Sequence, residues 1–68
     1  MTPTAFESRC RRDWAQAWLA RDARRHAQAF DALSDDDKGR VQATARVDVG
    51  MLGRDGVKEL AERWAALE

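Results

Sequence analysis

The sequence predicts an all-α protein, a small three-helix domain with a long first helix and two shorter helices. Thirteen of its 68 residues are Ala, and only one is Pro. The segment 5–33 contains neither Gly nor Pro, so nothing in it is a strong helix breaker. The last segment repeats apolar residues at helical spacing. We expect a single helical domain over residues 1–68, because so short a chain has no room for a second core.

The first predicted helix begins beside Thr4. Thr4 is followed three residues later by Glu7, a spacing typical of a capping box, in which the Thr side chain accepts a hydrogen bond at the helix start. The helix should therefore run from Ala5 to about Leu33. Glu7 and Arg11 are four residues apart and are expected to support its exposed face as an ion pair.

The apolar stripe of this helix changes sides near Arg21 to Arg25. At about 100° per residue, one face carries Phe6, Cys10, Trp14, Ala17 and Trp18, and nearly the opposite face carries Leu19, Ala23, Ala27, Phe30 and Leu33. Either the helix bends or breaks there, or one straight helix packs different partners on its two halves. We favour the straight helix with the two shorter helices on its halves, because kinks usually have a Pro or Gly as their cause.

The second predicted helix runs from about Asp35 to Asp48. Ser34 is a favoured N-cap residue, and the three aspartates that follow it suit the positive end of the helix dipole. The same acidic run lacks the spaced ligands of a calcium loop, so we interpret it as a helix start. Its apolar positions are few: Val41, Ala45 and Val49.

The third predicted helix closes the chain. Gly50, Gly53 and Gly56 mark the turn before it, and Asp55 or Gly53 is expected to cap it. The glycine spacing is not followed by the Lys and Ser or Thr of a phosphate-binding loop, which favours an ordinary turn. The helix has a regular stripe of Val57, Leu60, Ala61, Trp64 and Leu67, and Trp64 should lie in the core.

No residue pattern indicates catalysis, a cofactor or a metal. The chain has one His and one Cys, too few for a zinc site, which needs three or four ligands. Cys10 shares an apolar stripe and has no base nearby in sequence, so it is expected to be a buried small hydrophobe. His26 is expected to be a half-buried helix residue. The protein is therefore predicted not to be an enzyme, with no cofactor.

Charge and hydropathy limit the partners and the cellular location that the sequence predicts. Twelve Lys and Arg balance twelve Asp and Glu, and the pI near 6.6 argues against a dedicated binder of duplex nucleic acid. No run of apolar residues is long enough for a membrane span. The lone Cys and the lack of an apolar leader favour a cytoplasmic protein.

The candidate partner-binding surface lies on the first helix. Trp18, Arg21, Arg24 and Arg25 combine aromatic and cationic groups, as many protein interaction hot spots do, and we expect Trp18 to be only partly buried. The alternatives are a solvated or ion-paired face, and a nucleic-acid contact.

The expected function is that of a non-enzymatic protein-binding module. Its small size and Arg-rich usage suit a phage- or plasmid-encoded inhibitor, of anti-CRISPR or antitoxin type, that acts on a larger bacterial protein. The alternative is a nucleic-acid-associated regulator that uses the Arg-rich face. A core this small is rarely stable without disulfides, metals or oligomerisation, so a homodimer or a protein partner is expected to contribute to stability.

Overall fold

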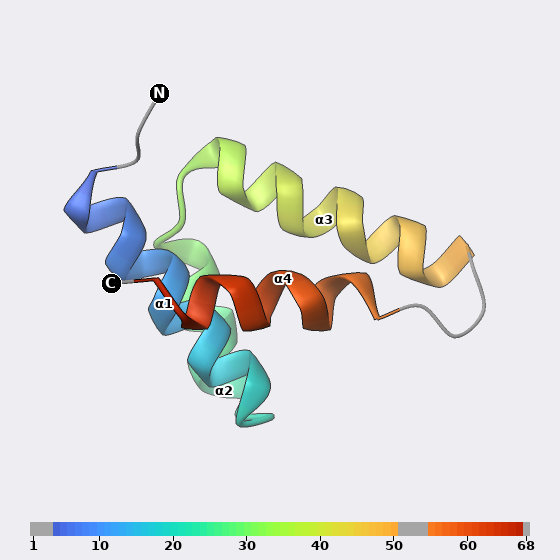
Figure 1. The fold of residues 1–68 in the computed structure, drawn as a ribbon, viewed down its shortest axis with the longest axis horizontal. Coiled ribbons are helices and arrows are strands. Elements are labelled where there is room, and N and C mark those ends of the chain that lie inside the picture. The colour runs from blue at the N-terminus through green and yellow to red at the C-terminus, as the bar shows by residue number, and fades with distance from the viewer. Residues whose placement is uncertain (1–3, 51–54, 68) are drawn as a thin grey trace.

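The computed structural model describes residues 4–50 and 55–67, and these form four helices. They are α1 (Ala5–Leu19), α2 (Ala23–Asp31), α3 (Asp35–Gly50) and α4 (Gly56–Ala65), shown in Figure 1. The all-α class is confirmed. The expected count of three helices is wrong, because the first predicted helix is two helices. The part of the predicted turn that holds Gly53 lies outside the described residues.

The chain breaks between α1 and α2 without Gly or Pro. Arg21 has a φ of 58°, in the left-handed region. This conformation lets the Arg21 N–H donate to the carbonyl of Trp18 and the Asp22 N–H donate to the carbonyl of Ala17, both at 3.0 Å. The pattern closes the end of α1 as a glycine would at the same position. The Asp22 carboxylate then accepts a hydrogen bond from the backbone N–H of Arg25 at 3.1 Å and starts α2.

This break overturns the expected straight helix and explains the reversing stripe. Because the chain turns at Arg21, Ala29 and Phe30 of α2 pack partly buried against the core that Trp14 of α1 belongs to, although Trp14 and Phe30 would point in nearly opposite directions on a straight helix. Trp14 of α1 and Leu33, just after α2, are 2% and 4% exposed. The buried cluster consists of Trp14, Ala15, Leu33, Val41, Leu60, Ala61 and Trp64.

The helices pack in pairs. α1 packs against both α2 and α4, and α3 packs against α4; Figure 1 shows α3 and α4 running past each other as an antiparallel pair. The expected packing, with two shorter helices on the two halves of one long helix, is therefore wrong. The helices pack in the order α2, α1, α4, α3, each against the next. Trp64 is 5% exposed and meets Trp14 edge to face, with ring centroids 5.5 Å apart, so its predicted place in the core is confirmed.

Side-chain oxygens define the helix starts. Thr4 accepts from the Glu7 N–H at 3.0 Å and Ser34 accepts from the Asp37 N–H at 3.2 Å, which confirms both predicted caps. Asp55 occupies the N-cap position of α4 as expected, but its side chain makes no capping hydrogen bond. The carboxylate of Asp48, near the end of α3, accepts the hydrogen bonds from the first N–H groups of α4 instead.

Candidate functional site

An apolar groove of about 620 Å³ opens between α2 and α3. These two helices are connected by only a few residues, yet they are not one of the pairs that pack closely. Trp14 and Trp18 from α1 and Val57 from α4 also line the groove. The remaining lining residues are His26, Ala27, Phe30 and Asp31 of α2 and Val41, Ala45, Asp48 and Val49 of α3.

The groove is bordered by one face of each flanking helix. On α3, Val41, Ala45 and Val49 are spaced by four residues and so lie on one side of the helix. On α2, Ala27 and Phe30 are three residues apart and share a side in the same way. Ala27 is exposed, and Val49 is 86% exposed. Apolar groups therefore line a surface that the described residues leave open to solvent.

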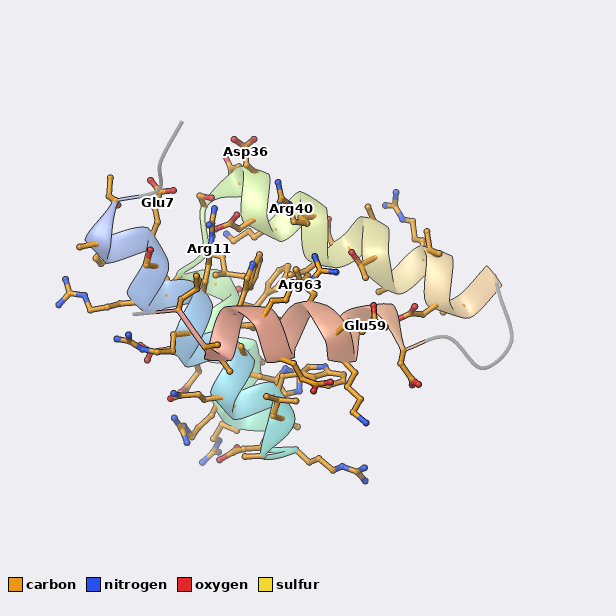
Figure 2. The ribbon with its side chains drawn as sticks, in the orientation of Figure 1. Glu7, Arg11, Asp36, Arg40, Glu59 and Arg63 are labelled. Carbon is orange, nitrogen blue, oxygen red and sulfur yellow. The ribbon has the colours of Figure 1, made fainter. Side chains whose placement is uncertain are left out.

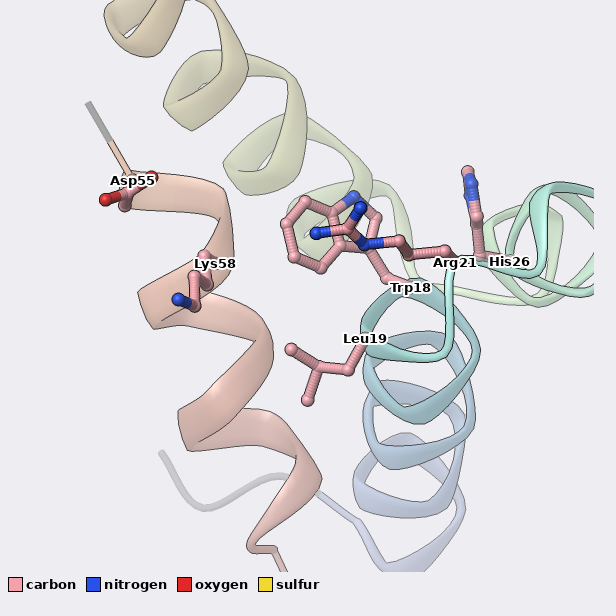
Figure 3. A pocket seen from close by; sticks show the side chains of 6 residues that line it. All are labelled: Trp18, Leu19, Arg21, His26, Asp55 and Lys58. Atoms are coloured by element: carbon pink, nitrogen blue, oxygen red, sulfur yellow. The ribbon is translucent and has the colours of Figure 1, made fainter. Parts of the chain in front are cut away.

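A second hollow, of about 570 Å³, adjoins the groove at the junction of α1 and α2. The two hollows share Trp18 and His26. Figure 3 shows its lining residues, with Asp55 and Lys58 on α4 and with Trp18, Leu19 and Arg21 at the end of α1. This second hollow adds cationic groups to one end of an otherwise apolar surface.

The structure brings together only part of the predicted binding surface. Trp18 is half-buried, as expected, and its ring packs beside Trp14 with centroids 6.4 Å apart. Arg21 is exposed and lines the second hollow with Trp18. Arg24 and Arg25 are exposed on α2 and line none of the described cavities. Within residues 4–50 and 55–67, none of these arginines forms a salt bridge.

The strongest polar contact of the described chain is structural. The guanidinium of Arg11 donates twice to the Asp37 carboxylate, from Nε to Oδ2 at 2.6 Å and from Nη2 to Oδ1 at 2.9 Å. It also lies 5.4 Å from the ring centroid of Trp64. The hydrogen bond to Asp37 raises the pKa of Arg11 above its ordinary value, although partial burial works in the opposite direction.

This ion pair corrects two expectations from the sequence. Arg11 pairs with Asp37 and not with Glu7; Figure 2 shows Arg11 reaching from α1 toward the first turn of α3. Asp37 was expected only to suit the dipole at the helix start, but its side chain is 3% exposed and pairs with Arg11. The sequence alone does not distinguish Asp37 from Asp35 and Asp36, because the distinction comes from a side chain of another helix, Arg11 of α1.

His26 and Cys10 lie where a structural role suffices. His26 is half-buried, as expected, and lines both hollows. Cys10 is a free thiol that is half-buried against the core cluster, so it is less buried than expected. In the described part of the chain, no three His, Cys, Asp or Glu side chains gather as a metal site would require. No helix in that part combines the length and apolar character needed to cross a bilayer.

The sequence does not predict the groove. Phe30, Val41 and Ala45, which line it, belong to the apolar stripes that the sequence predicts to pack in the core. The available signal was the small number of apolar positions on α3, which left that helix with too little apolar surface to close against its neighbours.

Comparison with known proteins adds no assignment. No protein-family model matches this chain, and no significant match was found among curated proteins or solved structures.

Proposed function

We propose that this chain is a non-enzymatic protein-binding module that docks its partner in the groove between α2 and α3. The observation that carries the proposal is an open apolar surface with a half-buried Trp18 at its inner side. Concave apolar surfaces with aromatic anchors are preferred sites of protein recognition. Trp18 retains its predicted role as an anchor, while Phe30 and Val49 replace Arg24 and Arg25 in the contact surface.

Such a module would act by covering a surface of a larger protein. Steric occlusion of that surface requires only contact, with no catalytic group. This mode of action suits a small phage- or plasmid-encoded inhibitor of a bacterial protein, of anti-CRISPR or antitoxin type. Partner binding would also bury apolar surface that the chain does not cover itself.

Affinity capture with two matched variants tests the proposal. Ala27 lines the groove, and its neighbour Gln28 is exposed and lines none of the described cavities. Ala27→Glu places a carboxylate in the apolar groove, whereas Gln28→Glu makes a similar charge change beside it. Both substitutions introduce Glu, which is a good helix former, so neither should unfold α2.

We expect the wild type and Gln28→Glu to capture the same protein from a bacterial lysate in equal amounts, measured by quantitative mass spectrometry. Ala27→Glu should capture at least about tenfold less, because an unpaired carboxylate is costly in an apolar interface. Equal capture by all three forms would show that the groove is not the docking surface.

The same samples test the nucleic-acid alternative. A gel-shift experiment with wild type and the Arg24→Gln, Arg25→Gln double variant measures any DNA binding by the Arg-rich surface of α2. Binding that falls steeply with salt and is lost in the double variant, in the absence of a captured protein, would replace the present proposal with a nucleic-acid function.

A further inference from the structure

The shape of the groove fits a helix better than an extended segment. Two helices present one apolar stripe each to the same open space, the arrangement that receives a third helix in helical bundles. The α3 stripe spans nine residues, from Val41 to Val49, and the eight steps between them rise about 12 Å at 1.5 Å per residue. An amphipathic helix with anchors at i, i+3, i+4 and i+7 covers a similar length.

The charges around the two hollows are unevenly distributed. Arg21 and Lys58 are exposed and line the second hollow, where Asp55 is the only carboxylate among the lining residues that the structure describes. Asp31, which ends α2, lines the groove at the opposite end of that helix from Arg21.

The other carboxylate of the groove is already engaged. The two oxygens of Asp48 accept from the N–H groups of Gly56 and Val57, each at 2.9 Å. Asp48 therefore has one backbone donor on each oxygen and is directed at the start of α4. Among the described lining residues, the charged side chains with no such backbone contact are Arg21, Lys58 and Asp55 at the second hollow and Asp31 at the other end.

We infer that the occupant of the groove is an amphipathic helix of the partner protein that carries carboxylates at one end. Its apolar stripe contacts Trp18, Phe30 and Val49, and its acidic end lies beside Arg21 and Lys58. The inference rests on the proposed docking in the groove and adds the secondary structure and charge of the occupant.

Three synthetic peptides serve as probes. Each has 14 residues, is labelled with a fluorophore and carries Leu at i, i+3, i+4 and i+7 among Ala and Gln. They differ only in the last turn, which holds two Glu, two Gln or two Lys. A peptide can lie in the groove in either direction, so the terminal charges reach Arg21 and Lys58 in one of the two orientations.

Binding is measured by fluorescence anisotropy at about 0.15 M salt, where distant charges are largely screened. We expect the Glu peptide to bind about fivefold tighter than the Gln peptide, the effect of one or two exposed ion pairs. The Lys peptide should bind more weakly than the Gln peptide. All three should lose affinity for Ala27→Glu and retain it for Gln28→Glu.

Two double variants test whether the preference comes from the named cations. Arg21→Gly with Lys58→Gln should remove the preference for the Glu peptide. Arg9→Gln with Arg46→Gln removes two exposed arginines that line none of the described cavities, and should retain it. Circular dichroism of each variant verifies that its helices are intact.

The outcomes separate the inference from the proposed function. Equal affinities for the Glu and Gln peptides, or a preference that survives Arg21→Gly with Lys58→Gln, would overturn the acidic occupant. Failure of all three peptides to bind would overturn the helical occupant. The groove itself is tested independently by the difference between Ala27→Glu and Gln28→Glu in lysate capture.

Discussion

At the scale of single residues, Arg21 is the clearest case of a side chain in a backbone conformation that suits glycine. Its φ of 58° costs an L-residue about 1–2 kcal/mol relative to the right-handed region. Glycine is the usual residue at this position after a helix. Arg21 is exposed, so its side chain contributes little burial to offset that cost.

We therefore predict that Arg21→Gly stabilises the protein by about 0.5–1 kcal/mol. The gain is smaller than the strain because Gly also increases the entropy of the unfolded chain. Urea unfolding followed by circular dichroism measures the change. Arg24→Gly is the matched control, since Arg24 lies within α2 and the same substitution there should destabilise by about 1 kcal/mol. Destabilisation by both changes would show that Arg21 is not strained.

The Arg11–Asp37 pair should respond unequally to loss of its two members. The Arg11 side chain is 18% exposed and the Asp37 side chain 3%. A guanidinium that loses its partner can turn to water, whereas a carboxylate buried beneath packed helices cannot. Removing the arginine therefore leaves the more costly orphan.

We expect Arg11→Met to cost about 3 kcal/mol and Asp37→Asn about 1–2 kcal/mol in the free energy of unfolding. Met preserves much of the apolar stem of Arg11 beside Trp64, so the difference reports on charge. Urea titrations of the two single variants and the double variant provide the coupling energy. Equal costs for the single variants would contradict the asymmetry.

At the scale of elements, the start of α4 depends on a side chain of α3. Asp48 supplies both capping hydrogen bonds, while Asp55 at the N-cap position supplies none. A Cβ placed on Gly56 would lie 2.7 Å from Asp48 Oδ1, so the absence of a side chain at Gly56 permits this close approach. The cap joins two helices as well as starting one.

We predict that Asp48→Ala destabilises the protein by about 1–2 kcal/mol, the usual cost of losing a cap. Asp55→Ala should change the stability by less than about 0.5 kcal/mol, because an exposed side chain without a partner is lost. Hydrogen exchange at the N–H groups of Gly56 and Val57 locates the effect in α4. A larger cost for Asp55→Ala would mean that the cap belongs to Asp55.

The elements were predictable where a helix start is local in sequence. Thr4 and Ser34 cap their own helices, and the stripe of α4 predicts its buried residues because its period is regular. The break at Arg21 was predicted only as the alternative to a straight helix, because its signal is a single capping aspartate, Asp22, and not Gly or Pro. The role of Asp48 could not be predicted, since its partners belong to another helix.

At the scale of the whole molecule, the core and the groove share several of the chain's few large apolar side chains. Trp14 is buried in the core, yet it also lines the groove together with Trp18. The reversing stripe does contain the information that residues 5–33 have two apolar faces. It does not reveal that a turn would bring Phe30 and Leu33 to the core around Trp14 and leave α2 and α3 apart.

An occupant of the groove should therefore stabilise the entire fold. A ligand that binds only the folded state at a concentration one hundred times its Kd adds about 2.7 kcal/mol to the free energy of unfolding. In a domain of this size, 1 kcal/mol shifts the Tm by about 4–8 °C. We accordingly expect the Glu peptide at this concentration to raise the Tm by about 10–20 °C in a circular-dichroism melt.

The same melt distinguishes groove binding from general peptide effects. Gln28→Glu should show most of the shift seen in the wild type, and Ala27→Glu should show almost none, because its added carboxylate occupies the groove. The free Ala27→Glu protein should melt close to the wild type, since Ala27 is exposed. A peptide that binds the wild type by anisotropy without raising its Tm would have comparable affinity for the unfolded chain, and the groove would then not be its site.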